Sequence, residues 1–270
     1  MVALHRRHLL AGIGSALTVG LSGCGSDSGD EGTDTEPETG RDTEPTTETT
    51  TLAEAETPMA TETRAGTARL RVAHMSPDAP DIVASVDGDV VPADLGIPFS
   101  RVGDYAEVPA GTRQFTLTEL NGDDVFFDQE VTLDAADYTF VAAGEVIDDE
   151  PEFQVLPLVD DNSDPGENTA RLRVVHVSPD AGPVDVTAEA GPVLFEGVEF
   201  TDSEYVPVEA GDYTVRVRPE TTNGDGKVID DMELSLNGGT VYTAFASGYL
   251  DVEFASDASF ELTVVQDAGP

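Results

Sequence analysis

An internal repeat constrains the fold of this chain more than any other feature. Residues 67–80 read TARLRVAHMSPDAP, and residues 169–183 read TARLRVVHVSPDAGP. Two later pairs of segments match in the same order: DYAEVPAG (104–111) with SEYVPVEAG (203–211), and YTFVAAG (138–144) with YTAFASG (242–248). The offset between matching residues stays at about 100 to 104, so the chain carries two tandem copies of one module. Each copy has the size of a small domain.

Both copies have the residue pattern of β-strands. Residues 213–218 alternate with period two, which places Tyr213, Val215 and Val217 inward. Residues 241–246 and 260–265 are further β-rich runs, and no segment has a capped helical stripe. Hairpin signals separate the runs at Asp87-Gly88, Asn121-Gly122-Asp123, Asn223 to Gly226 and Asn237-Gly238-Gly239. The sequence therefore predicts an all-β chain with about seven or eight short strands in each copy, arranged as two tandem immunoglobulin-like β-sandwiches.

The repeated motifs resemble a known family. The opening LRVxHxSPDA occurs at residues 70–79 and 172–181, and a strand, a tyrosine and an Ala-Gly pair follow it in each copy. This order resembles domain-of-unknown-function family 4397 (DUF4397). The first copy departs from the family pattern at Thr112 to Phe115, and the second inserts Gly182. The resemblance covers about two thirds of the chain. It implies tandem sandwiches in a secreted or surface-anchored prokaryotic protein, and it brings no established activity.

The N-terminal residues 1–24 have the parts of an export signal. Arg6 and Arg7 precede a short apolar stretch that ends near Leu21, and this pair resembles a twin-arginine signal. The segment Leu21-Ser22-Gly23-Cys24 resembles a lipoprotein lipobox, in which the cysteine thiol carries a lipid and becomes the mature N-terminus. The alternative is a plain signal peptide with an incidental cysteine. We expect export through Arg6 and Arg7 and lipid attachment at Cys24, which would place the protein on the extracellular face of the membrane.

Residues 25–66 consist almost entirely of Thr, Glu, Asp, Pro, Gly and Ser, with Leu52 and Met59 as their only large apolar side chains. Such a segment cannot bury enough surface to offset the entropy of ordering, so we predict a disordered acidic Thr/Pro linker that acts as a stalk. Its threonine clusters are candidate sites for O-linked sugars. The remaining boundaries that we predict are sandwich repeat 1 at residues 67–160, an acidic linker at residues 161–168, and sandwich repeat 2 at residues 169–270.

The charge of the chain restricts its partners and its habitat. It has 54 acidic and 13 basic residues, a net charge of −41, and Lys227 as its single lysine. No cationic patch is expected for nucleic-acid phosphates. An acidic, lysine-poor surface is typical of proteins in multimolar salt, where the Debye length falls to about 3 Å and self-repulsion is screened. With the N-terminal signals, the chain resembles a haloarchaeal-type twin-arginine lipoprotein. The alternative is an acidic secreted protein from a low-salt habitat.

The repeated His-x-Ser-Pro-Asp motifs contain the residue types of a catalytic triad. They are His74 to Asp78 and His176 to Asp180. A triad needs side chains that converge on one substrate atom, and three residues within one tight turn rarely do so. We interpret each histidine as an inward strand-end residue bonded to the turn, with the aspartate accepting backbone N–H groups in an Asx-type turn. Ligand contact and catalysis are the alternatives, and we assign no catalytic residue.

Metal sites receive little support from the sequence. His5 and His8 belong to the export signal, and the other two histidines lie in different copies. Cys24 is the only cysteine, which excludes a disulfide framework and a thiolate zinc site. The run Asp160 to Pro165 resembles the acidic linkers of cadherin repeats, where calcium stiffens a domain junction. We favour solvated acidic loops there and at Asp123-Asp124 and Asp148 to Glu150, with interdomain calcium as the alternative. We predict no cofactor and no metal.

These features predict a lipid-anchored, non-enzymatic surface protein that serves as a binding, adhesion or cell-envelope scaffold module. Its partners would be the membrane, through the lipid on Cys24, and an extracellular protein or glycan. Duplication suits this role because it increases avidity without requiring an active site. One alternative is a carbohydrate-binding module, whose aromatic platform would be Tyr105, Tyr205 or Tyr249 on an exposed face. A second is a hydrolase, which requires a cleft with carboxyl groups of raised pKa or a converging histidine.

Overall fold

The computed structural model describes residues 66–91, 96–147, 150–189, 191, 193–221, 226–251 and 258–270. Arg6, Arg7 and Cys24 lie outside the described residues, as does the stalk apart from Gly66. Every regular element in these ranges is a β-strand, which confirms the all-β prediction. Within the same ranges, no helix has the length and hydropathy needed to cross a membrane.

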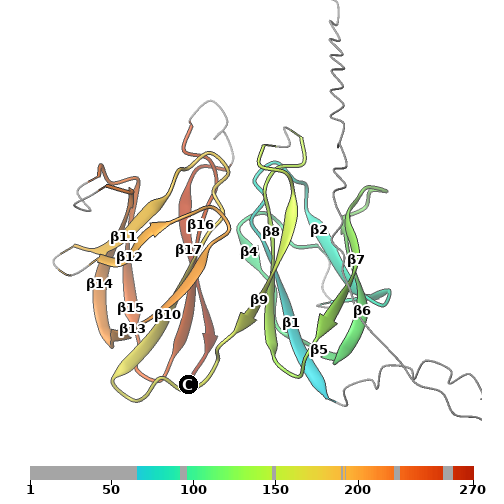
Figure 1. Ribbon diagram of the computed structural model, residues 1–270, viewed down its shortest axis with the longest axis horizontal. Coiled ribbons are helices and arrows are strands. Elements are labelled where there is room, and N and C mark those ends of the chain that lie inside the picture. The colour runs from blue at the N-terminus through green and yellow to red at the C-terminus, as the bar shows by residue number, and fades with distance from the viewer. Residues whose placement is uncertain are drawn as a thin grey trace, which may run out of the picture. The chain divides into compact units, whose positions relative to one another are not determined.

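Each repeat forms the same succession of strands (Figure 1). Repeat 1 contains β1 (Thr67–His74), β2 (Ile82–Val86), β3 (Asp89–Val90), β4 (Arg101–Val102), β5 (Ala106–Pro109), β6 (Gly111–Glu119), β7 (Val125–Leu133), β8 (Asp137–Ala143) and β9 (Gln154–Asp160). Repeat 2 contains β10 (Thr169–His176), β11 (Val184–Ala188), β12 (Val193–Val198), β13 (Ser203–Glu209), β14 (Gly211–Pro219), β15 (Asp230–Leu236), β16 (Val241–Ser247) and β17 (Glu261–Ala268). β13 corresponds to β4 and β5 together, because it pairs with β10 as those two strands pair with β1.

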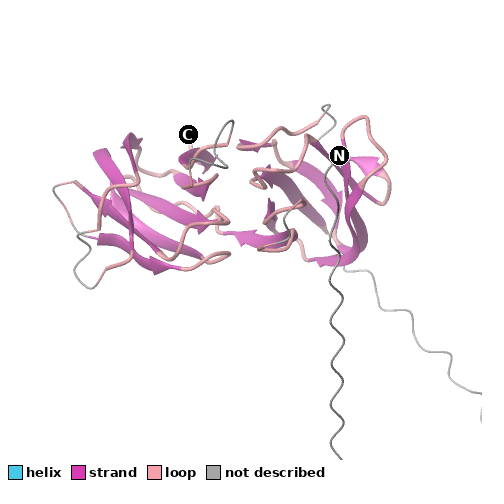
Figure 2. Cartoon of the chain, turned by 90° about the horizontal axis from the view of Figure 1, so that it is seen from above, coloured by secondary structure: helices cyan, strands magenta, loops and turns pink. Residues whose placement is uncertain are grey.

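The strands of each repeat form two sheets that face each other (Figure 2). In repeat 1 the orders are β4-β1-β8-β9, with β5 also paired to β1, and β3-β2-β6-β7. In repeat 2 the orders are β13-β10-β16-β17 and β12-β11-β14-β15. β1 and β8 are parallel, as are β10 and β16, whereas the other pairings are antiparallel. Because these pairs are parallel, the C-terminal ends of both strands lie at the same edge of the sheet. The histidine motif after β1 or β10 therefore lies beside the loop that follows β8 or β16.

Local sequence explains the turns and the interior. Asp87 and Gly88 join β2 to β3 with φ values of 51° and 87°, the backbone shape that an Asp-Gly hairpin adopts. The predicted turn at Asn223 to Gly226 lies mostly outside the described residues. Val215 and Val217 are buried as predicted, and each side chain of this size contributes about 1.5–3 kcal/mol on burial. Tyr213 lies half-buried at the margin of the same core.

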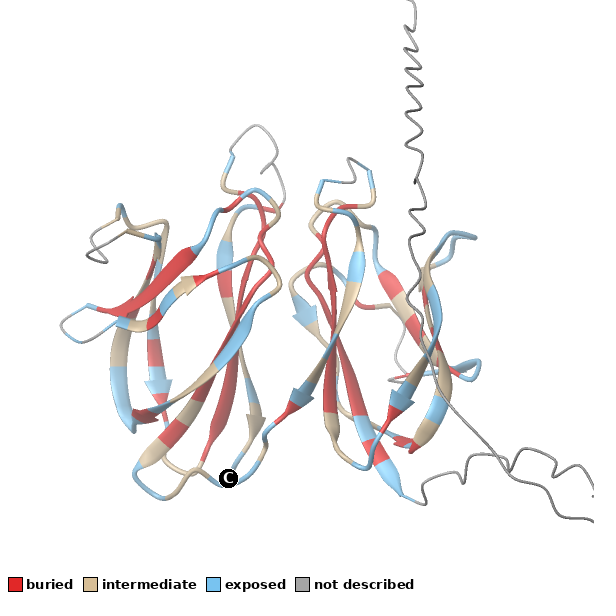
Figure 3. Cartoon of the chain, in the orientation of Figure 1, coloured by how far each residue is buried: buried red, intermediate tan, exposed pale blue. Residues whose placement is uncertain are grey.

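The central strands of one sheet in each sandwich are buried on both faces (Figure 3). β8 and β16 lack the alternation of a half-exposed strand, since nearly every side chain along them is buried. A third apolar cluster accounts for the second face and takes residues from both repeats: Ala73, Met75, Val141, Ala143, Val175, Val177 and Phe245. The two sandwiches therefore pack against each other through the β1 and β10 sheets, and their contacts group them in one compact unit.

Candidate functional site

The two motif histidines are buried at the ends of β1 and β10. His74 and His176 are both 0% exposed. The Nε2 atom of His74 lies 3.0 Å from the carbonyl oxygen of Pro80, and that of His176 lies 3.1 Å from the carbonyl oxygen of Gly182. Burial lowers the pKa of both imidazoles below the usual value, although the carbonyl partners act in the opposite direction. Each ring is therefore neutral near pH 7, and the predicted strand-end histidine bonded to a tight turn is confirmed.

The serine and aspartate of each motif bind a distant loop. In repeat 1, Ser76 donates to the carbonyl oxygen of Gly144 at 2.6 Å, and the Asp78 carboxylate accepts the backbone N–H groups of Val146 and Ile147. The same bonds recur in repeat 2 from Ser178 to Gly248, and from Leu250 and Asp251 to Asp180. The predicted Asx-type turn is wrong, because the aspartate accepts from the loop after the parallel neighbour strand. These side chains are engaged in structural bonds and do not converge on a cleft.

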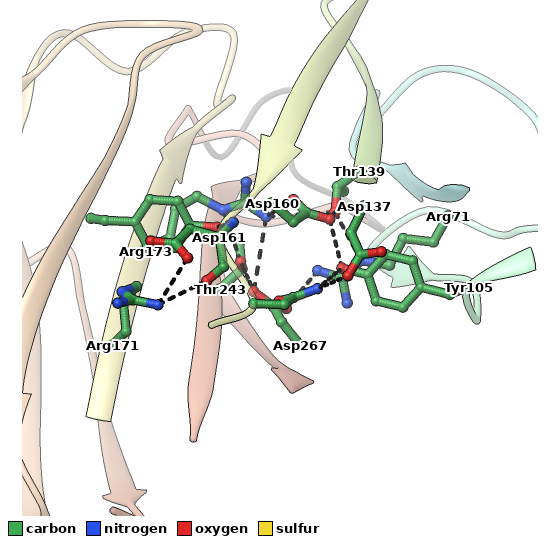
Figure 4. Close-up of polar contacts among 12 residues, drawn as sticks. Arg71, Tyr105, Asp137, Thr139, Asp160, Asp161, Arg171, Arg173, Thr243 and Asp267 are labelled. Carbon is green, nitrogen blue, oxygen red and sulfur yellow. Dashed lines mark hydrogen bonds and ion pairs between the residues drawn. The ribbon is translucent and has the colours of Figure 1, made fainter. Parts of the chain in front are cut away.

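A buried polar cluster joins the two sandwiches (Figure 4). We call it the junction network, and it consists of Arg71, Thr139, Asp160, Arg173, Thr243 and Asp267. The Nε atom of Arg71 donates to Thr139 at 2.8 Å, and its Nη2 atom pairs with Asp267 of repeat 2 at 2.5 Å. Arg173 mirrors this arrangement: it donates to Thr243 at 2.9 Å and pairs with Asp160 of repeat 1 at 2.8 Å. Each arginine thus binds a threonine of its own repeat and an aspartate of the other.

The two threonines complete the junction network. Thr139 donates its hydroxyl to Asp160 at 2.8 Å, and Thr243 donates to Asp267 at 2.5 Å. The charged side chains are almost fully withdrawn from solvent, with 4% exposure for Arg71, 1% for Arg173 and 0% for both aspartates. Burial raises the pKa of the Asp267 carboxyl even though Arg71 lies beside it. Desolvation therefore offsets much of the attraction within this ion pair.

Two tyrosines cover the arginines of the junction network. The guanidinium of Arg71 lies 4.6 Å from the ring centroid of Tyr105, and that of Arg173 lies 5.0 Å from the ring centroid of Tyr205. The Tyr105 hydroxyl donates to Asp160 at 2.6 Å. Burial raises the pKa of both phenols, that of Tyr205 to about 12. Both tyrosines remain neutral hydrogen-bonding groups at physiological pH.

The predicted aromatic platform is therefore wrong. Tyr249 is only 7% exposed, and its hydroxyl donates to Glu145 of the other repeat at 2.5 Å. Tyr105 and Tyr205 are half-buried against arginines, and none of the three presents an open ring for stacking. The physical reason is that all three flank the sheets that meet at the junction, where their rings fill space between the repeats.

The side chains of the acidic linker between the repeats form hydrogen bonds and an ion pair with other groups of the protein. Asp161 pairs with Arg171 at 3.1 Å and accepts a hydrogen bond from the Ser163 hydroxyl at 2.6 Å. Asn162 donates to Asp137 at 2.8 Å, and Asp164 accepts the backbone N–H of Gly166 at 2.8 Å. Among the described residues, no three His, Cys, Asp or Glu side chains gather as a metal site. The geometry gives no support to the calcium alternative at this linker, and Asp148 and Asp149 lie outside the described residues.

Several solved structures show a remote likeness to the chain. The chain shares 8% identity with the TIE protein of Bacillus anthracis at a TM-score of 0.23, covering 69% of this chain and 34% of that one, so it spans about a third of that protein. It shares 9% identity with the CBM26 module of Eubacterium rectale Amy13K in complex with maltoheptaose, at a TM-score of 0.24 and coverages of 74% and 98%. For family 41 carbohydrate-binding modules from streptococcal virulence factors, the identity is 13%, the TM-score 0.20, and the coverages 66% and 92%. TM-scores this low support no conclusion about the function of this chain.

One protein family matches the chain. No curated protein matches the chain. One family matches it twice, at residues 68–187 and 183–270, and together these segments span both sandwiches and more than half of the sequence. The chain therefore belongs to the family described as Domain of unknown function (DUF4397).

Proposed function

We propose that this chain is a lipid-anchored, non-enzymatic surface protein in which two immunoglobulin-like sandwiches act as one rigid binding, adhesion or scaffold unit. Arg6 and Arg7 would direct its export, a lipid on Cys24 would hold it at the extracellular face of the membrane, and the stalk would project the sandwiches outward. The junction network carries this proposal. Buried pairs that cross between repeats resist separation, because opening the junction would expose charges that lose their partners.

The position of the junction supports a role in binding. It uses the β1 and β10 sheets, so β6, β7, β14 and β15 of the other sheets keep outward side chains that are exposed or half-buried. Two such faces held in one unit would let a surface protein engage partners on both modules at once. The partner class that we propose is an extracellular protein or glycan.

The chemistry of the described residues favours a non-enzymatic role. The histidine motifs are engaged in structural bonds, and Asp267, a carboxyl whose pKa is raised, lies in a buried ion pair. Six of the eight arginines in the described part of the chain pair with a carboxylate. The charges of these arginines are paired within the protein. This supports the proposals that the protein binds no nucleic acid and that its acidic surface is adapted to high salt.

Mass spectrometry of the protein extracted from membranes in high salt tests the anchor. We expect a mature N-terminus at Cys24 that carries a lipid mass, and we expect the Cys24→Ser variant to appear in the medium. A double Arg6→Lys, Arg7→Lys variant keeps the charge of the signal but removes the twin-arginine pair, so it should accumulate inside the cell. An unmodified Cys24, or a membrane-bound Cys24→Ser protein, would overturn the anchor.

A further inference from the structure

Arg69 in repeat 1 and Arg171 in repeat 2 occupy matched positions in their strands but have different partners. Arg69 lies opposite Asp137 in the parallel pair of β1 and β8. Its Nε atom donates to Oδ1 of Asp137 at 2.7 Å, and its Nη2 atom donates to Oδ2 of the same carboxylate. The guanidinium also lies 4.9 Å from the ring centroid of Tyr105. Both donors on this edge of the guanidinium, which we call the fork, are therefore bonded.

In repeat 2 a valine replaces that carboxylate. Arg171 lies opposite Val241 in the parallel pair of β10 and β16. Its Nη1 atom binds the linker instead: it pairs with Asp161 at 3.1 Å (Figure 4) and donates to the carbonyl oxygen of Ser163 at 2.7 Å. Within the described part of the chain, the Nε and Nη2 atoms of Arg171 have no hydrogen-bond partner. The fork that binds a carboxylate in repeat 1 is thus unoccupied in repeat 2.

A hollow of about 200 Å³ lies beside this fork. It is lined by Pro165, Thr169, Arg171, Tyr205, Val206 and Pro207. Arg171 stands opposite Pro207 in β10 and β13, and Arg173 stands opposite Tyr205. Side chains at opposite positions, and at every second position along a strand, share one face of a sheet, so Thr169, Arg171 and Tyr205 all lie on the same face. The Arg171 side chain is 22% exposed, which leaves it within reach of a ligand.

Two hydroxyl groups of the hollow are also available to a ligand. The Tyr205 hydroxyl accepts the backbone N–H of Asp161 at 3.3 Å, and it stays protonated because burial raises its pKa to about 12. Its proton has no acceptor among the described residues, whereas the matched Tyr105 donates to Asp160 at 2.6 Å. The Thr169 hydroxyl likewise has no partner in the ranges that the structure describes. Repeat 2 therefore carries a fork and two hydroxyls that are not bonded within the protein.

These groups suit a carboxylate that also carries hydroxyls. A guanidinium fork binds a carboxylate through two parallel, charge-assisted hydrogen bonds, and the hydroxyls of Thr169 and Tyr205 can bond to hydroxyls of the same ligand. An acidic protein side chain would satisfy the fork but neither hydroxyl. The hollow is smaller than the range of about 300–1,000 Å³ for drug-sized ligands, so it suits one compact unit. We propose that the hollow at Arg171 binds a hexuronate unit of an extracellular glycan; this inference rests on the proposed binding function and names its ligand class on repeat 2.

The charge of the chain sets the conditions for this binding. A net charge of −41 repels an anion in dilute buffer. In multimolar salt the Debye length is about 3 Å, so repulsion by distant carboxylates is screened while direct bonds in the hollow remain. Asp161 lies beside Arg171 but pairs with its Nη1 atom, and its own side chain is 54% exposed. We therefore expect the hexuronate to bind in high salt.

Titration of the isotope-labelled full chain with trigalacturonate in multimolar potassium chloride, followed by NMR, tests the site. We expect binding that shifts the amide resonances of Thr169, Arg171 and Val206. The neutral methyl ester of trigalacturonate should bind at least about tenfold more weakly, because it cannot accept the charge-assisted pair. N-acetylglutamate amide presents the carboxylate of an acidic protein side chain without the sugar hydroxyls, and it should also bind at least about tenfold more weakly.

Three variants locate the binding. Arg171→Met removes the fork and should weaken binding of trigalacturonate at least about tenfold. Val241→Asp supplies repeat 2 with the carboxylate that repeat 1 has, and it should weaken binding by a similar factor because it occupies the fork. Val241 is only 1% exposed, so Arg171→Met carries the test if Val241→Asp fails to fold. Arg69→Met in repeat 1 is the matched control and should leave binding unchanged, because the fork of Arg69 is already occupied.

The outcomes separate this inference from the proposed function. Failure of trigalacturonate to bind, or binding that is unchanged in Arg171→Met, overturns the hexuronate site, whereas the lipid on Cys24 is measured independently and would still stand. Equal binding of the methyl ester overturns recognition of the carboxylate. Binding of N-acetylglutamate amide that equals or exceeds that of trigalacturonate overturns the glycan as the ligand and favours an acidic protein. Binding that is lost in Arg69→Met contradicts the assignment to repeat 2.

Discussion

Removing one carboxylate from the junction network should destabilise the protein strongly. Asp267→Asn keeps the shape of the side chain and its bond to Thr243, but it leaves the guanidinium of Arg71, only 4% exposed, without its paired carboxylate. An uncompensated buried charge of this kind costs about 3–5 kcal/mol in the free energy of unfolding. For a folded unit of this size, the midpoint of thermal unfolding should fall by roughly 6–20 °C.

Replacing both partners should restore most of that stability. Burial raises the pKa of Asp267 despite Arg71, which indicates that desolvation opposes the ion pair. The double variant Arg71→Met, Asp267→Leu removes the unpaired charge but leaves the buried Thr243 hydroxyl without its acceptor, so it should unfold within about 1–2 kcal/mol of the wild type and be more stable than Asp267→Asn. Urea denaturation in high salt, followed by circular dichroism, measures all three proteins.

An exposed ion pair provides the matched control. Arg216→Met removes the pair with Glu189, whose side chains are 27% and 52% exposed, and should cost only about 0–1 kcal/mol. The reasoning fails if Asp267→Asn costs no more than this control. It also fails if the double variant is as unstable as the single one.

Three further predictions concern pH, the loop anchors and salt. Because burial depresses the pKa of His74 and His176 relative to about 6.5 in the unfolded chain, unfolding takes up protons, so stability is retained above about pH 6.5 and lost as the pH falls. Urea titrations between about pH 7.5 and about pH 5 should show a slope that His74→Gln reduces by about half. Asp180→Asn should cost about 1–2 kcal/mol and accelerate amide exchange at Leu250 and Asp251, which donate to that carboxylate; unchanged exchange would contradict the anchor. Dilution from multimolar to about 0.1 M salt should lower the thermal midpoint, because the Debye length grows to about 10 Å; a midpoint that rises would refute adaptation to high salt.

Much of the fold follows from local sequence. The tandem copies appear as matched segments, the alternation around Val215 and Val217 marks an inward face, and Asp87-Gly88 marks a hairpin. Such signals are readable because they depend on neighbours along the chain, where side-chain period and turn geometry act directly. The buried strand-end position of the histidines follows from the same alternation.

The junction network could not be predicted in this way. Arg71 and Asp267 lie far apart in the sequence, and nothing near either residue indicates its partner. The sequence does indicate that β1 is buried on a second face, because residues 72–75 place apolar side chains on both sides of the strand. It does not indicate which surface covers that face. The aromatic platform of the carbohydrate-binding alternative fails for the same reason, since a tyrosine ring that covers a buried arginine of its own repeat has the same local sequence as one that faces solvent.

Crosswise pairing also explains where the two copies can differ. Each arginine of the junction network pairs with an aspartate from the other repeat. A substitution of one partner in either copy alone would therefore leave a buried charge unpaired. The outer sheets have no such mutual dependence, and there Arg113 stands opposite Tyr213, and Thr116 opposite Arg216, in the alignment of the copies. The two copies therefore share their residues at the junction and differ on the outer sheets. This is the pattern expected of two modules that are fixed to each other and bind through separate faces. Binding specificity is therefore expected to differ between the two repeats.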